Sequence, residues 1–137
     1  MRSVSLGFAF AAVVLSPPAC RNPFTDDSVI LAVSGLSAPS VILKGAAATV
    51  ILGVSVSGCE SFAQVTQTRV KSGILLTALG ANPAVGNENL SCPAVITVEQ
   101  HSVVIDQALD RSFTVFVRQP SGGTPLRADI SVVDTID

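Results

Sequence analysis

Beyond residue 28, apolar and polar residues alternate along much of this chain. A period of two is typical of β-strands, in which successive side chains point to opposite faces, whereas a helix repeats its apolar positions every three or four residues. The apolar members of three such stretches are Val50, Leu52, Val54 and Val56; Phe113, Val115 and Val117; and Leu126, Ala128, Ile130 and Val132. The pattern predicts strands with one buried and one solvent-facing side.

Segments rich in Gly, Pro, Asn and Ser divide the alternating stretches into pieces of strand length. The expected strands are Ser28–Val33, Thr49–Val56, Phe62–Val70, Ile74–Leu79, Ala94–Glu99, Ser102–Ile105, Ser112–Arg118 and Leu126–Val133. Seven or eight short strands favour an all-β fold, a single β-sandwich domain over residues 29–137. The composition, 48% hydrophobic against 13% charged, excludes a disordered chain.

The segment Val103–Val117 contains an expected strand, a tight corner from Asp106 to Arg111 and a second strand entered at Phe113. It resembles the corner between two late strands of immunoglobulin-like and fibronectin-like sandwiches, where a tyrosine often occupies the position of Phe113. The resemblance implies an immunoglobulin-like architecture. It carries no activity with it.

The N-terminus has the layout of an export signal. Arg2 supplies a positive charge, no charged residue interrupts the apolar run from Val4 to Leu15, and small residues and prolines follow it. A membrane span needs about 20 apolar residues, and Pro17 and Pro18 prevent the helix from continuing. We therefore expect residues 1–19 to be a signal peptide rather than an anchor.

The pair Ala19-Cys20 at the end of this segment resembles the processing site of a bacterial lipoprotein precursor. The resemblance implies cleavage after Ala19, diacylglycerol on the Cys20 sulfur and a lipid tether over residues 20–28. The domain would then be held on a membrane surface of the cell envelope, on its periplasmic or outer face. The alternative is ordinary signal cleavage nearby, which would release a secreted domain with a free Cys20.

The chain has three cysteines, and an odd number in an exported protein needs an explanation. Lipidation of Cys20 would account for one, which leaves Cys59 and Cys92 to form a disulfide in an oxidising compartment. Two buried thiols are the alternative. A metal site on these cysteines is less favoured, because His101 is the single histidine and the chain has no C-x-x-C spacing.

The charges and the histidine content narrow the function classes. Eight Lys and Arg stand against ten Asp and Glu, for a formal net charge of −2, and the chain has neither Trp nor Tyr. A nucleic-acid partner is therefore not expected. One histidine and no G-x-S-x-G motif predict a protein that is not an enzyme and has no cofactor and no metal site.

Two features remain as candidate sites. Glu99 and His101 are two residues apart and share a strand face, which permits a carboxylate-imidazole pair, although an exposed polar strand end explains them equally. The longest loop, Gly80–Ser91, is a possible ligand loop, because loops at the ends of a rigid sandwich often carry binding residues. Its polar candidates are Asn82, Asn87, Glu88 and Asn89.

Together these features predict an exported, membrane-tethered lipoprotein whose non-catalytic β-sandwich acts as a binding or structural module. Another envelope protein is a candidate partner. One alternative is a secreted enzyme or enzyme inhibitor that uses Glu99 and His101 or the long loop. A second is an assembly or adhesin-type subunit that pairs strand edges, which an unprotected apolar outer strand would favour.

Overall fold

The structure is a computed structural model that describes residues 28–105 and 110–135. The predicted signal peptide, Cys20 and residues 106–109 of the predicted corner lie outside this part of the chain. Ser28, the last residue of the predicted tether, is already the first residue of a strand and pairs with Ala81. Among the described residues, no helix has the length and apolar character that a membrane crossing requires.

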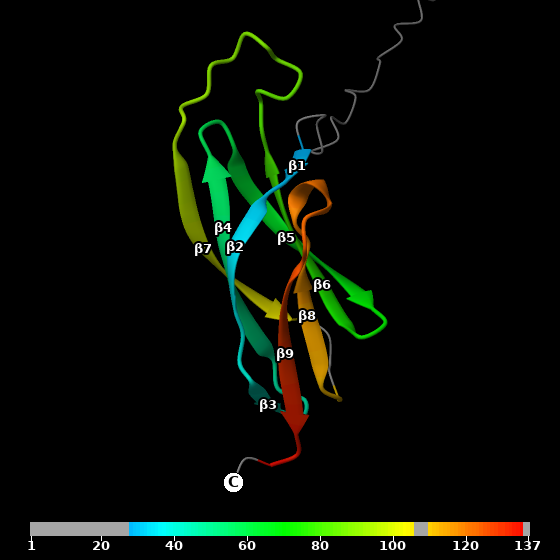
Figure 1. Ribbon diagram of the computed structural model, residues 1–137. Helices are drawn as coiled ribbons and strands as arrows, with labels where there is room; N and C mark the ends of the chain where they lie inside the picture. Colours follow the sequence, from blue (N-terminus) through cyan, green and yellow to red (C-terminus); the bar gives the residue numbers. More distant parts are fainter. Residues whose placement is uncertain (1–27, 106–109, 136–137) are drawn as a thin grey trace, which may run out of the picture.

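The described residues form an all-β fold with two sheets, which confirms the predicted β-sandwich (Figure 1). One sheet has six strands and the other has three. The elements are β1 (Ser28–Ile30), β2 (Ala32–Ser37), β3 (Val41–Leu43), β4 (Ala48–Ser57), β5 (Ser61–Val70), β6 (Gly73–Ala81), β7 (Ile96–Ile105), β8 (Phe113–Val117), the 3₁₀ turn η1 (Pro120–Gly122) and β9 (Leu126–Val133).

The larger sheet is built around β6. Strand β5 pairs antiparallel with it, β1 pairs with its C-terminal end, and β8 lies parallel to its N-terminal half. The sheet continues through the antiparallel pair β8–β9 and ends with the parallel pair β3–β9. Two parallel pairs therefore join strands that are distant in the sequence, and no local hairpin could make these connections.

The smaller sheet has the order β2-β4-β7, with both pairs antiparallel. The chain crosses from one sheet to the other at Leu31, between β1 and β2, where its N–H donates to the carbonyl of Ala78 in β6 at 2.9 Å. Leu31 is buried between the two layers. One residue thus links the sheets at the start of the domain.

The core lies between the sheets and consists almost entirely of aliphatic side chains. Alternate residues of β4 and β8 point into it, as the period of two predicts, and Ile130 of β9 completes that face. The largest fully buried side chains are Leu31, Leu52, Ile74, Leu76, Ile130, Val50, Val54, Val115 and Val117. Close packing of these side chains is the main source of stability of the described fold.

The structure corrects the predicted strands in three places. The expected strand Ser28–Val33 is two strands, β1 and β2, because the chain passes from one sheet to the other at Leu31. The expected strands Ala94–Glu99 and Ser102–Ile105 are one continuous ten-residue strand, β7, because Gln100 and His101 continue its pairing with Gly53 and Leu52 of β4. In addition, β3 was not expected: its three residues find their partner in β9, far along the chain. A pairing between distant segments leaves no local sequence signal.

Candidate functional site

The predicted ligand loop is held by its own asparagines. The side-chain oxygen of Asn82 accepts from the N–H of Ala84 at 3.0 Å, and that of Asn87 accepts from the N–H of Asn89 at 3.3 Å. Such bonds stabilise turns. Two of the four candidate residues therefore have a structural role in the loop, and among the described residues Glu88 belongs to no group of three or more His, Cys, Asp or Glu that could hold a metal ion.

The predicted disulfide between Cys59 and Cys92 is present, with a Cα–Cα distance of 5.2 Å. It ties the β4–β5 turn to the segment that leads into β7. The same turn needs glycine, because a Cβ at Gly58 would lie 1.9 Å from the carbonyl oxygen of Pro93. The covalent bond and this close approach together fix where β7 begins.

The edges of the two sheets differ in how they are protected. On β2, the Gln119 side chain bonds both backbone groups of Val33: its amide donates to the carbonyl at 2.8 Å and its oxygen accepts the N–H at 3.1 Å. A register shift between Val33 and Gly35 also interrupts this strand. Bulges and covering groups of this kind prevent another strand from pairing with an edge.

Replacing Gln119 by alanine is expected to lower the free energy of unfolding by about 1 to 3 kcal/mol, because Val33 would lose two partly buried hydrogen bonds at once. Urea unfolding followed by circular dichroism would measure this change. Gln64→Ala on the exposed side of β5 is the control and should change stability by less than about 0.5 kcal/mol. Equal stabilities of the two variants would contradict the capping role of Gln119.

The larger sheet also has guarded edges. Strand β3 is three residues long, which offers little backbone for pairing. Strand β5 has a register shift between Phe62 and Gln64, and its exposed positions are mainly polar. Short edges, bulges and polar side chains all discourage edge pairing.

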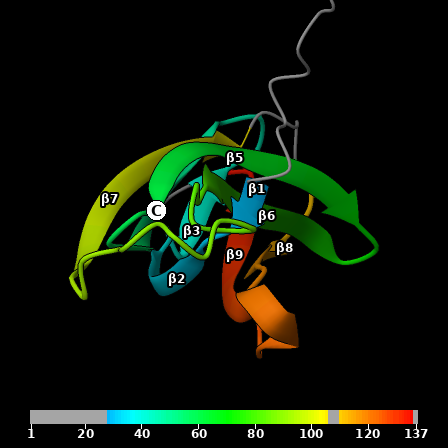
Figure 2. The ribbon, with the colours of Figure 1, turned by 90° about the horizontal axis from the view of Figure 1, so that it is seen from above.

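Strand β7 has fewer of these protections, and the Gln67 side chain of β5 covers its backbone at Val104, near its C-terminal end. Its ten residues pair with β4 without a register shift, and it contains no proline and no lysine. Figure 2 shows β7 as an outer curve of the molecule. Two of its apolar residues are largely exposed to solvent: Ile96 is 72% exposed and Val98 is 52% exposed. Among the described edges, β7 is therefore the one that is long and regular and exposes large apolar side chains.

The exposed apolar residues of β7 lie in a row on the outer face of the small sheet. Val103 and Ile105 point into the core, so alternate residues from Ile96 to Val104 point outward. Gly53 of β4 confirms this placement, because a Cβ there would lie 3.3 Å from both Val98 Cγ1 and Gln100 Nε2. We call these residues the β7 outer row: Ile96, Val98, Gln100, Ser102 and Val104.

The backbone of the β7 outer row faces away from β4. The carbonyl of Val104 accepts from Gln67 Nε2 of β5 at 2.7 Å, so Val104 directs its backbone groups toward the open edge. In a regular strand the N–H and C=O of one residue point to the same side and alternate along the chain. Ile96, Val98, Gln100 and Ser102 therefore share this direction.

His101 and Glu99 form the expected pair on the opposite face of β7. His101 Nε2 lies 3.1 Å from Glu99 Oε2, and the imidazole stacks on Phe62 of β5 with ring centroids 3.6 Å apart. His101 lines a shallow groove of about 370 Å³ between β5 and β7. Among the described residues, no third His, Cys, Asp or Glu joins the pair, so it braces β7 against β5 rather than forming a convergent polar site.

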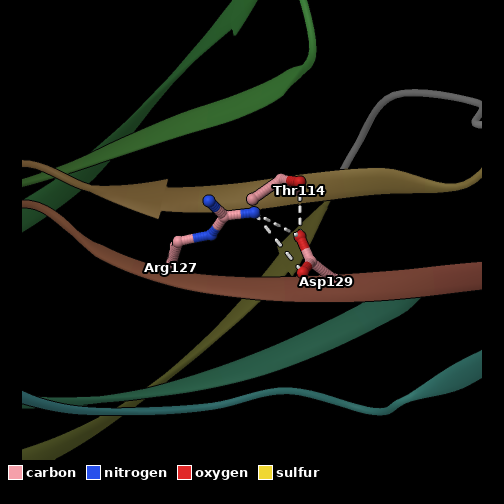
Figure 3. A network of polar contacts seen from close by, with 3 residues as sticks. All are labelled: Thr114, Arg127 and Asp129. Carbon is pink, nitrogen blue, oxygen red and sulfur yellow. Dashed lines mark hydrogen bonds and ion pairs between the residues drawn. The ribbon is translucent and has the colours of Figure 1, made fainter.

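A second polar network lies on the outer face of the larger sheet (Figure 3). Thr114 Oγ1 donates to Asp129 Oδ1 at 2.6 Å, and Arg127 Nη2 donates to the same carboxylate at 3.2 and 3.4 Å. These residues lie on the paired strands β8 and β9, and the side chains of Arg127 and Asp129 are exposed. The network links neighbouring strands and encloses no cavity.

The hydrogen bond from Thr114, followed by that from Arg127 and its positive charge, holds the pKa of Asp129 below its ordinary value. A lowered pKa stabilises the fold above the unfolded-state pKa of about 4, and this contribution is lost as pH falls through the folded-state pKa. Thr114→Val should raise the pKa of Asp129 toward its ordinary value in an NMR titration. Ser131→Ala is the control, and an unchanged pKa in Thr114→Val would contradict this origin of the shift.

Comparisons of this chain with protein families, curated proteins and solved structures found no match.

Proposed function

We propose that this chain is a non-catalytic binding module that accepts an extended strand of a protein partner along the free edge of β7. The observation that carries the proposal is the contrast between β7, which is long and regular and exposes large apolar side chains, and the protected edges of β2, β3 and β5. This extends the assembly-subunit alternative, for which an unprotected apolar outer strand is the expected signature.

Strand addition explains what each part of this edge would do. The outward N–H and C=O groups of Ile96, Val98 and Gln100 would bond to the backbone of the added strand and supply affinity that does not depend on its sequence. The exposed side chains of Ile96 and Val98 would pack against neighbouring side chains on the same face. The partner is therefore a segment with uncharged, partly apolar residues at those positions.

We also propose that the module is exported and anchored in the cell envelope through a lipid on Cys20, with secretion as the outcome if Cys20 is not modified. The support is the export-signal layout of residues 1–19 and the resemblance of Ala19-Cys20 to a lipoprotein processing site. The Cys59–Cys92 disulfide is compatible with that location. No cofactor or metal is part of this proposal.

A blocked seven-residue peptide of alternating threonine and valine is a suitable probe of strand addition. Its addition to the full chain should slow amide hydrogen exchange at Ile96, Val98 and Gln100, because their N–H groups would become hydrogen-bonded. Exchange in β6 should not change, because this strand already has partners on both sides. NMR or mass spectrometry would follow both regions.

Val98→Pro is the variant that tests the site, because proline removes the outward N–H and its ring obstructs an added strand. Val85→Lys in the long loop is a control outside the sheets, because it leaves the hydrogen bond from the N–H of residue 85 to the carbonyl of Asn82 in place. The peptide should protect β7 in the wild type and the control variant, and not in Val98→Pro. Equal protection in both variants, or none in the wild type, would reject strand addition at β7.

The anchor is tested by the intact mass of the protein extracted from membranes of a bacterial expression host. Cleavage after Ala19 with a diacylglycerol-modified Cys20 is the expected result, and Cys20→Ser should abolish both the added mass and membrane retention. A wild-type protein that keeps residues 1–19, or that lacks lipid on Cys20, would contradict the lipid anchor.

A further inference from the structure

We infer that the strand accepted by β7 is β7 of a second copy of this chain, paired antiparallel about a two-fold axis at Val98. This inference rests on the proposed strand addition and names its partner. The two three-stranded sheets would then form one continuous six-stranded sheet across the interface. A two-fold contact of this type uses the same surface on both copies and closes on itself.

The position of the axis follows from the neighbours of β7. Near its C-terminal end, Gln67 of β5 already bonds the carbonyl of Val104, so this part of the edge has no room for a full-length partner strand. The N-terminal part, from Ile96 to Gln100, has no such contact among the described residues. An axis at Val98 centres the new pairing on this free part.

In this register the β7 outer row is complementary to itself. Val98 lies opposite the partner's Val98, and Ile96 lies opposite the partner's Gln100, so the three facing residues of each copy would exchange about six backbone hydrogen bonds. The Val98 pair is apolar, and an apolar pair at facing positions stabilises antiparallel strands.

Charge also favours a second copy. The β7 outer row contains no charged residue, although each chain has a formal net charge of −2. On the opposite face, Glu99 would lie across from the partner's Thr97, so the register places no like charges opposite each other. Each copy therefore meets a neutral surface on the other.

The expected dimer is weak in solution. A contact made by one strand from each copy is smaller than the roughly 1,200 Å² that stable interfaces bury, so a dissociation constant in the micromolar range or above is expected. Two copies tethered to one membrane surface would meet at a high effective concentration, which compensates for weak intrinsic affinity. The contact would therefore form mainly where the protein is concentrated.

Charge exchange at Val98 tests the partner and the register together. Sedimentation velocity of the full chain in detergent should show a dimer whose fraction rises with concentration. Val98→Lys and Val98→Glu should each weaken it at least ten-fold, because identical charges would face each other across the axis. An equimolar mixture of the two variants should restore the dimer, since lysine would then face glutamate. Val85→Lys, at a residue 47% exposed in the long loop, should dimerise like the wild type.

Disulfide trapping gives an independent measure of the register. Val98→Cys should cross-link to itself under mild oxidation, and peptide mapping should identify the bond between the two copies. Gln100→Cys should not, because its two copies would lie about 14 Å apart along the antiparallel strands, beyond the roughly 7 Å that a disulfide can span. Cross-linking through Gln100→Cys with none through Val98→Cys would overturn the proposed axis.

The failures of the two proposals are distinguishable. A wild-type chain that stays monomeric but still binds the threonine-valine peptide along β7 would refute the second copy as partner and leave strand addition intact. A chain that neither dimerises nor binds the peptide would refute both. A dimer that Val98→Lys does not weaken would place the contact elsewhere on the molecule and overturn the inference.

Discussion

Replacing both Cys59 and Cys92 by serine is expected to lower the free energy of unfolding by about 3 to 4 kcal/mol. The bond joins residues separated by 33 positions, so its loss lets the unfolded chain explore many more conformations. A small domain has a total stability of only about 5 to 15 kcal/mol, so the expected loss is a large fraction of it. The double variant avoids leaving one unpaired thiol behind.

Urea unfolding with and without reductant would measure this effect and supply its own control. Reductant should bring the wild type to the stability of the double variant and should leave the double variant unchanged. Hydrogen exchange should rise most in the residues before β7 and in its first residues, because the disulfide holds this end against the β4–β5 turn. A loss below about 1 kcal/mol would show that other contacts hold the turn and β7 together.

Leu52→Ala is expected to destabilise the fold by about 3 to 5 kcal/mol. Leu52 is 0% exposed and lies on β4, the central strand of the smaller sheet, between Leu36 of β2 and His101 of β7. Shortening its side chain removes apolar contacts and leaves a cavity that the two rigid sheets cannot fill. Thermal and urea unfolding would both report the loss.

Ile51→Ala is the matched control, because Ile51 is the next residue on the same strand and points to the outer face, where it is 41% exposed. Its expected cost is about 1 kcal/mol or less, since little apolar surface returns to water. Similar costs for the two variants would mean that β4 does not present its alternate faces as described, and would contradict the assignment of the core.

Local alternation was a sound guide to much of this fold. In β4 the sequence places Val50, Leu52 and Val54 on one face, and all three are fully buried. The predicted bounds of β9 agree with the structure, because arginine, aspartate and serine interrupt its apolar positions regularly. The disulfide could be predicted because the export-signal layout of the N-terminus and an odd cysteine count left one natural pair. The strand faces and bounds depend on residues that are neighbours in the sequence, and the disulfide follows from the number of cysteines.

The candidate site on β7 could not be predicted in the same way. Considered alone, the segment from Ile96 to Glu99 suggests that Ile96 and Val98 point inward and Glu99 outward. The structure instead places Ile96 and Val98 on the outer face and Glu99 on the opposite face, because β7 is continuous and the burial of Val103 and Ile105 sets the direction of every alternate residue before them. Two separate short strands could each choose a face, whereas one long strand cannot.

The sequence also contains no sign of how the edge of β2 is protected. Gln119 caps β2 from a position far along the chain, and nothing near it in the sequence marks Val33 as its partner. The stacking of His101 on Phe62 likewise depends on how β5 and β7 meet in space. Such contacts follow from topology, and topology here includes pairs that join distant segments.

The parallel pair β3–β9 has a consequence for the order in which the fold can be completed. Residues 41–43 have no strand partner until residues 131–133 pair with them. Until then Ile130 is not buried in the core. While β9 is unpaired, the apolar side chains of β8 that belong to the core stay exposed to solvent. We therefore expect this layer to be completed late, because its pairing closes a very large loop, and a chaperone would protect the chain best before the final strand has paired.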